Sequence, residues 1–239
     1  MKTEKTIWQK SRETLLQELD STPEGLTGAE AARRLEQYGP NELQEGGRKS
    51  VLRIFLEQFA DFLVIILILA AVVSAILGDV ESMAVILAVI TMNAILGTVQ
   101  TVKAPASLDS LKQMSAPTAK VVRDGQVVQI PGREVTVGDV VVLEAGDAIC
   151  ADGRLLESAS LQIEEAALTG ESVPVHKVID ALDLDGKKDV PLGDRKNMCY
   201  MGSTVVYGRG RALITRAGMD TEMGKIAGAL ASAVEEQTP

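Results

Sequence analysis

Two long apolar runs dominate the first half of the chain. Phe62 to Gly78 and Ser82 to Val102 contain no charged residue, and the connection between them is short and acidic. Because an α-helix needs about 20 apolar residues to cross a bilayer, the pattern predicts a transmembrane hairpin with helices at about residues 60–78 and 82–102. The alternative is a pair of buried helices in a soluble core. Buried helices rarely stay uncharged over such lengths, and the remaining chain is too small to enclose two of them.

Charges at the ends of these runs predict an orientation. Basic residues precede the first run and follow the second, namely Arg48, Lys49, Arg53, Lys103, Lys112 and Lys120, whereas the connection carries only Asp79 and Glu81. By the positive-inside rule, both termini face the cytoplasm and the connection lies on the far side. Asp61 begins the first helix, and we interpret it as a solvated boundary residue, with a functional carboxylate at membrane depth as the alternative. We therefore expect an integral membrane protein.

A second pattern precedes the hairpin and predicts short helices. Thr27 and Glu30 have the spacing of a capping box, apolar positions follow on one face, and Gly39-Pro40 ends the pattern. Ser11 to Leu19 predicts another short helix. We expect residues 1–50 to form a helical part without catalytic residues.

After the hairpin the hydrophobic period changes from 3.6 to 2, which is typical of strands. Asp124-Gly125 between two alternating segments predicts a β-hairpin turn. Short strands are expected at Thr118–Val122, Gln126–Ile130, Val135–Leu143, Leu155–Glu157, Leu161–Ile163, Met198–Met201, Thr204–Tyr207 and Arg211–Thr215. They indicate a small β-sandwich or distorted barrel. The fold class is α+β, with a two-helix hairpin in 51–104, a small all-β domain in 105–220 and a helical segment in 221–239.

Composition narrows the possible functions. The 239 residues include 24 basic and 33 acidic side chains, and this net charge of −9 argues against a nucleic-acid partner, since such proteins gather Lys and Arg to bind phosphates. Cys150, Cys199 and His176 are the complete set of Cys and His residues in the sequence. Three such residues cannot form the usual four-ligand zinc site, and a disulfide framework is equally unexpected.

One segment carries candidate chemistry. Thr169-Gly170-Glu171-Ser172 follows a predicted strand, where Gly170 permits close approach of another body and Glu171 presents a carboxylate that could position or deprotonate a water. The tetrapeptide is also an ordinary turn composition, and an isolated exposed Glu is usually only solvated. The sequence has neither GxxxxGK[ST] nor a GxGxxG that opens a helix after a strand, so no nucleotide site is predicted. Any chemistry at Glu171 would act on a group supplied by another domain.

Several longer motifs together resemble one family. They are GPNEL (Gly39 to Leu43), LEQFADFLVIIL (Leu56 to Leu67), NAILGTVQ (Asn93 to Gln100), VTVGDVVVLEAGD (Val135 to Asp147), ALTGESVPVHK (Ala167 to Lys177) and GMDTEMGKIA (Gly218 to Ala227). In this order they resemble the amino-terminal part of a P-type cation-transporting ATPase, most closely the calcium pumps of the sarcoplasmic-reticulum type and their bacterial relatives. The resemblance covers nearly the whole chain. It implies a first transmembrane hairpin joined to an actuator domain, a distorted jelly-roll or sandwich with N-terminal helices.

The resemblance also implies a role for the tetrapeptide. Members of this family phosphorylate an aspartate in a DKTG motif, and the actuator's TGES loop then moves over it so that the glutamate helps water hydrolyse the acyl phosphate. Carried onto this chain, the loop is Thr169, Gly170, Glu171 and Ser172. Such a carboxylate orients the attacking water only in the dephosphorylating state. Glu164 and Glu165 are expected to be solvated neighbours without a role.

The sequence lacks DKTG, a nucleotide-binding domain and the later helices that hold the ion in this family. We therefore expect the amino-terminal segment of a pump that uses ATP and Mg²⁺ when intact, with neither bound by this chain and no activity of the chain alone. Its expected partners are the bilayer, the phosphorylation and nucleotide domains, and a transported cation, most simply Ca²⁺. A pump for Na⁺ or Mn²⁺ remains an alternative, as does a membrane-anchored β domain that binds or regulates.

Three residues depart from the family pattern. Cys150 stands where members commonly have a proline, and we expect a small buried apolar side chain there rather than a nucleophile. Pro105 follows Lys103-Ala104, and a proline there puts the straight continuation of the second helix in doubt. Ala60 replaces an acid, so a role of that acid in ion entry is not carried over.

Overall fold

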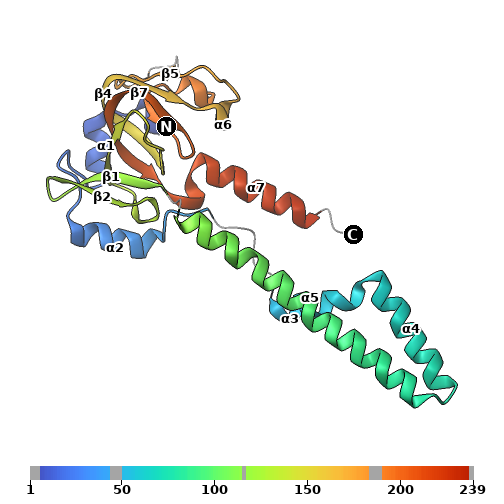
Figure 1. Ribbon diagram of the computed structural model, residues 1–239. Coiled ribbons are helices and arrows are strands. Elements are labelled where there is room, and N and C mark those ends of the chain that lie inside the picture. The colour runs from blue at the N-terminus through green and yellow to red at the C-terminus, as the bar shows by residue number, and fades with distance from the viewer. Residues whose placement is uncertain (1–5, 44–49, 115–116, 183–189, 237–239) are drawn as a thin grey trace, which may run out of the picture. The chain divides into compact units, whose positions relative to one another are not determined.

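The computed structural model describes residues 6–43, 50–114, 117–182 and 190–236. The chain divides into two compact units (Figure 1). Met1–Gly46 and Ala116–Pro239 form one, here called the β unit, and Gly47–Ser115 forms the other, here called the helical unit. Helices and a separate antiparallel sheet are both present, which confirms the α+β class.

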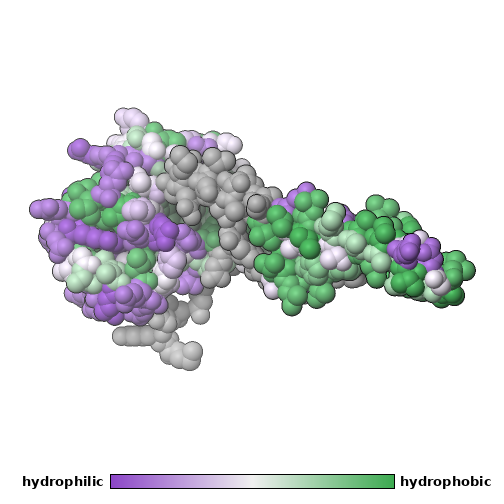
Figure 2. Space-filling model, turned by 60° about the horizontal axis from the view of Figure 1, so that its bottom comes forward, coloured by the Kyte–Doolittle hydropathy of each residue, from purple (hydrophilic) through white to green (hydrophobic). Residues whose placement is uncertain are grey.

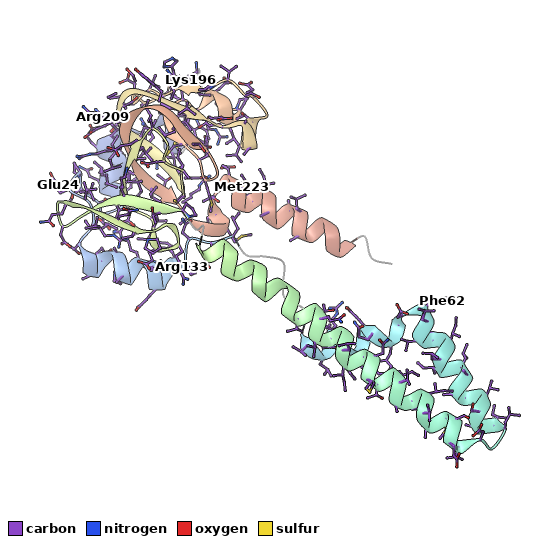
Figure 3. The ribbon with its side chains drawn as sticks, in the orientation of Figure 1. Glu24, Phe62, Arg133, Lys196, Arg209 and Met223 are labelled. Carbon is purple, nitrogen blue, oxygen red and sulfur yellow. The ribbon has the colours of Figure 1, made fainter. Side chains whose placement is uncertain are left out.

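The helical unit is a hairpin of apolar helices. Its elements are α3 (Val51–Glu57), η2 (Gln58–Ala60), α4 (Phe62–Ile76) and α5 (Val80–Met114). The two longest helices pack through mostly small or branched side chains that are buried between them, namely Val64, Ala71, Ile90, Ala94 and Thr98. Outward side chains such as Phe62, 74% exposed, are apolar, and the surface of this unit is largely hydrophobic (Figures 2 and 3). In lipid such a surface needs no further cover.

The first helix of the predicted transmembrane hairpin is shorter than expected. Of the described residues, Val80–Val102 alone forms a single helix long and apolar enough to cross a membrane. α4 has 15 residues, and it passes the same test only together with Val51–Ala60, from which it is bent by 68°. The cause is Asp61, whose carboxylate accepts a hydrogen bond of 2.9 Å from the Leu63 N–H and so begins a new helix at Phe62. Asp61 is exposed, as its interpretation as a boundary residue requires.

The second membrane helix is longer than predicted. The doubt over Pro105 was unfounded, because α5 runs without a break from Val80 to Met114, past the expected end at 102. A proline removes one hydrogen bond, the one to the carbonyl four residues earlier. In a helix of 35 residues, the bonds on both sides keep the segment helical.

The β unit is built around one antiparallel sheet. Its strands are β1 (Thr118–Arg123), β2 (Gln126–Pro131), β3 (Val140–Glu144), β4 (Asp152–Glu164), β5 (Val175–His176), β6 (Met198–Cys199) and β7 (Thr204–Arg216). They are ordered β2-β1-β3-β7-β4-β5, and β6 pairs with β4. The predicted turn at Asp124-Gly125 is confirmed, because β1 and β2 pair directly across it.

Two strands are much longer than the sequence suggested. The segments expected as separate strands join into the 13-residue strands β4 and β7, which pair along most of their length with several register shifts. One of the shifts, between Ala159 and Gln162, lies where Ser160 has φ 54° and Gly208 on the partner strand has φ 78°. Register shifts of this kind bend a sheet without ending it. Gly208, which lies between two segments predicted as separate strands, is needed because a Cβ there would lie 2.6 Å from the carbonyl oxygen of Ala159.

The core of the β unit lies along these strands. Its largest cluster contains fully buried aliphatic side chains, among them Val121, Val135, Leu155, Leu161, Ile163 and Val205. Cys150 and Cys199 belong to the same cluster as free thiols. Burial raises the pKa of Cys150 to about 11, and the expectation of a small buried side chain at this position is confirmed.

The N-terminal segment adds short helices to the sheet. They are η1 (Ile7–Gln9), α1 (Arg12–Glu18) and α2 (Gly28–Tyr38). The predicted cap is present, because Thr27 Oγ1 accepts from the Glu30 N–H at 3.2 Å. The carboxylate of Glu30 instead accepts hydrogen bonds from Arg33 and Arg34. Arg34 in turn donates to the carbonyls of Leu19, Asp20 and Val137, which attaches α2 to the rest of the unit.

Two buried polar side chains join distant segments of the β unit. Asn41 donates to the carbonyls of Gly132 and Cys150 and accepts from the Gly218 N–H at 2.7 Å. Asp152 accepts from the Met201 N–H at 2.9 Å and from the Glu222 N–H at 2.8 Å. The second bond fixes the start of α7 (Glu222–Glu236) to the first residue of β4.

Candidate functional site

The Thr169–Ser172 segment lies in the connection between β4 and β5. This connection begins with the single-turn helix α6 (Ala166–Thr169), which lies with β5 at one end of the β unit (Figure 1). The turn ends at Gly170, whose φ of 75° is left-handed and whose N–H donates to the Ala166 carbonyl at 2.9 Å. Good helix formers followed by glycine therefore produce a tight turn with a helical C-cap.

Thr169 fixes the conformation of this turn. Its Oγ1 donates to the Glu165 carbonyl at 3.0 Å and accepts from the Glu171 N–H at 3.2 Å. The hydroxyl therefore links the residue before α6 to the residue after Gly170. This bond sets the direction in which the chain leaves the turn.

Glu171 and Ser172 are both exposed at the tip of the connection. Within the described part of the chain, the Glu171 carboxylate has no hydrogen-bond or ion-pair partner. Val173, next to them, is 74% exposed. The structure brings the four predicted residues together in one loop and presents the carboxylate outward, where a group from another body can approach it. Their catalytic role stays a prediction.

The base of the connection holds a buried ion pair that the sequence analysis missed. Lys177 Nζ lies 2.5 Å from Glu165 Oε1, and both side chains are 0% exposed. Burial raises the pKa of Glu165, and the charge of Lys177 opposes that rise. The expectation that Glu165 is a solvated neighbour is therefore wrong, whereas Glu164 is exposed as expected.

A signal for this burial was present in the sequence. Side chains alternate between the two faces of a strand. Leu161 and Ile163 are fully buried, and Glu165 continues the same phase. On the returning strand, Lys177 is two residues after Val175. Glu165 and Lys177 thus both stand at positions whose side chains point into the unit. An acid and a base at two such neighbouring positions predict a buried ion pair.

The underside of α6 packs on a second apolar cluster. Leu168 and Leu192 pack against buried residues that include Trp8 from the N-terminal segment and Tyr200. The guanidinium of Arg195 lies 4.0 Å from the Trp8 ring centroid, a cation–π contact. Residues far apart in the sequence thus support the turn, and nothing in the local pattern around Thr169 indicated them.

The described residues contain no group of three or more His, Cys, Asp or Glu side chains placed to hold a metal ion. His176 is exposed, and the two cysteines are buried in the core. Among the described residues, the turn therefore presents the Glu171 carboxylate without a cluster of metal ligands beside it.

Comparison with known protein families matches most of the chain. The family model of the P-type ATPase actuator domain matches residues 113–231. The family model of the cation transporter/ATPase N-terminus matches residues 7–74. The first match includes the whole sheet and the Thr169–Ser172 turn, and the second includes the N-terminal helices and most of the first apolar run.

Curated relatives give the same result. A calcium-transporting ATPase of Listeria monocytogenes is 48% identical over 233 residues, 98% of this chain and 26% of its own length. Calcium-transporting ATPase 1 of Lactococcus lactis is 46% identical over 97% of this chain and 26% of its own length. A cation-transporting ATPase of Synechocystis is 41% identical over 95% of this chain and 25% of its own length. The chain thus spans about a quarter of the length of these relatives.

Proposed function

Because the chain belongs to the P-type cation-transporting ATPases and contains their actuator domain, we propose that Glu171 promotes hydrolysis of an aspartyl phosphate formed elsewhere in the intact pump. The observation that carries this proposal is the exposed carboxylate on a turn fixed by Thr169 and Gly170. A carboxylate on a movable domain can meet the phosphorylated group in one state of the pump and leave it in another.

The proposed step is a displacement at phosphorus. The oxygen of a water molecule attacks the phosphorus atom, and the bond between phosphorus and the aspartate oxygen breaks. Glu171 accepts a proton of that water as the new bond forms, and the products are inorganic phosphate and the free aspartate carboxylate. The Thr169 hydroxyl contributes by holding the Glu171 backbone, and Gly170 by allowing the turn.

ATP and Mg²⁺ belong to other domains in this proposal. In the intact pump, ATP would supply the phosphoryl group and Mg²⁺ would neutralise its charge. The described residues of this chain present no cluster of carboxylates for the ion and no glycine-rich phosphate loop. Removing the phosphate from the aspartate is therefore the part of the cycle proposed for this chain.

The helical unit supports a membrane location. We propose that α5, and α4 together with the bent segment before it, cross the membrane with both termini on the cytoplasmic side, because the basic residues flank the hairpin. We further propose Ca²⁺ as the transported ion, since the relatives from Listeria and Lactococcus are named calcium-transporting. Measuring Ca²⁺, Mn²⁺ and Na⁺ uptake into vesicles that contain the intact pump would separate these ions.

The substitution Glu171→Gln tests the proposed role. It keeps the size of the side chain and removes its basic oxygen, so the phosphoenzyme should decay about 10²- to 10⁴-fold more slowly while its formation from ATP is nearly unchanged. The measurement is a chase of labelled phosphoenzyme in membranes that contain the intact pump. Glu164→Gln is the matched control, because this neighbouring carboxylate is exposed and lies outside the turn. Normal decay in Glu171→Gln would rule out the proposed role.

A further inference from the structure

The buried pair of Glu165 and Lys177 closes the connection that carries the TGES turn. The chain leaves β4 at Glu164 and is back in the sheet at Val175, and the ion pair joins Glu165, the first residue after β4, to Lys177, the first residue after β5. Since both side chains are 0% exposed, water does not screen their charges. The two ends of the connection are therefore held together by a strong and directional contact.

The Glu165 end of this contact controls the turn. The Glu165 carbonyl accepts from the Leu168 N–H at 2.9 Å, the Thr169 N–H at 3.0 Å and the Thr169 hydroxyl at 3.0 Å. The same hydroxyl accepts from the Glu171 N–H. A displacement of Glu165 would therefore move Thr169 and, through it, the backbone of Glu171.

The Lys177 end is fixed to the sheet. Its N–H donates to the Leu161 carbonyl at 2.9 Å, and its carbonyl accepts from the Ser158 hydroxyl at 3.0 Å. Both partners belong to β4. The lysine side chain thus adds a second link between the sheet and the turn, beside the backbone that joins Glu164 to Glu165.

Stability alone is a poor explanation for this pair. The desolvation of two charges offsets most of their attraction, and replacement of a buried pair by apolar side chains is often neutral. Moreover, within the described residues Glu165 Oε2 has no hydrogen-bond partner, so the orientation of this carboxylate depends on Lys177. The contact is therefore better suited to orienting Glu165 and the turn that follows it than to stabilising the fold.

We propose that Glu165 and Lys177 are positioning residues that aim Glu171 at the phosphorylated group, an inference that rests on the proposed function above. Neither residue touches the reacting atoms. Their contribution reaches Glu171 through the carbonyl of Glu165 and the hydroxyl of Thr169.

Phosphoenzyme decay in the intact pump is the first test. Glu165→Gln and Lys177→Met should each slow the decay about tenfold, which corresponds to about 1.4 kcal/mol in the barrier, with the rate of phosphorylation unchanged. Glu164→Gln and Lys196→Met are matched controls that remove exposed charges nearby and should decay normally; Lys196 lies at the surface of the β unit (Figure 3). A purely structural role would lower the amount of phosphoenzyme formed and leave its decay rate normal, and that result would overturn the proposal.

Combined variants separate this proposal from the one on which it rests. In the Glu171→Gln background, adding Glu165→Gln should cause no further slowing, because the pair acts through the lost carboxylate. If Glu171→Gln itself decays normally, the proposed function fails. If Glu171→Gln is slow while Glu165→Gln and Lys177→Met decay normally, the positioning role alone fails. Thr169→Val breaks the later part of this path without an uncompensated buried charge, and normal decay in this variant would overturn the proposal even if the charge variants do not fold.

Amide exchange provides a readout without catalysis. In this chain, held in detergent, Lys177→Met should speed exchange at Leu168, Thr169 and Glu171 about tenfold, since their N–H groups depend on the Glu165 carbonyl and the Thr169 hydroxyl. Exchange in the core of β7 should not change. Equal exchange at the turn in variant and wild type would overturn the proposal.

Discussion

Two glycines with nearly the same φ should respond very differently to replacement by alanine. Gly170 has φ 75° and Gly208 has φ 78°. The left-handed conformation costs an L-residue about 1–2 kcal/mol, while alanine restricts the unfolded chain and returns about 0.4–1 kcal/mol. From the backbone alone, each substitution should lower the free energy of unfolding by about 1 kcal/mol.

The surroundings of the two positions separate them. A Cβ at Gly170 would meet nothing within 4 Å, so Gly170→Ala should cost only the backbone term. A Cβ at Gly208 would lie 2.6 Å from the Ala159 carbonyl oxygen and closer still to that of Ser160. These are backbone atoms of the paired strand, and moving them separates β4 from β7. Overpacking of this kind adds about 1–3 kcal/mol.

The expected difference can be measured by thermal unfolding. Trp8, the single tryptophan, is 7% exposed in the β unit, and its fluorescence therefore reports on that unit. At about 2–4 °C per kcal/mol, Gly170→Ala should lower Tm by about 2–4 °C and Gly208→Ala by about 4–16 °C. Equal shifts for the two variants would show that the space around each glycine does not decide its tolerance.

The remaining predictions concern reactivity, catalysis and topology. Burial raises the pKa of Cys150 to about 11 and that of Cys199 to about 12, so at pH 8 neither thiol of the folded chain should react with a disulfide reagent, and both should react in urea; rapid reaction without urea would contradict this. The chain alone should form no acid-stable phosphoenzyme with labelled ATP and Mg²⁺, and incorporated label would refute the assignment of phosphorylation to another domain. Asp79→Cys should react with an impermeant reagent from outside intact cells, whereas Glu171→Cys should react only after the membrane is opened; the reverse would invert the proposed topology.

Local chemistry made part of the fold predictable. The Thr27 cap and the Asp124-Gly125 turn depend on residues close in sequence, and both were located correctly. The continuity of β7 was not predictable in this way, because Gly208 is typical of a turn as well as of a close crossing between strands. Only the presence of the Ala159 and Ser160 carbonyls beside it decides between these roles.

The candidate site shows the same division. The Thr169–Ser172 turn could be located from its own residues. Its support could not, because Trp8 and Leu192 reach α6 from remote parts of the chain. Glu165 was misjudged for a different reason, since its charge was given more weight than its place in the alternation that follows Leu161 and Ile163.

The bond between Asp152 and the first turn of α7 has a mechanical consequence. The carboxylate joins the start of β4 to the Glu222 N–H, and Arg216, near the end of β7, reaches the Glu222 side chain at 2.6 Å. Both contacts reach the first residue of α7 from the sheet, so a rotation of the sheet would be transmitted to the first turn of this helix through them.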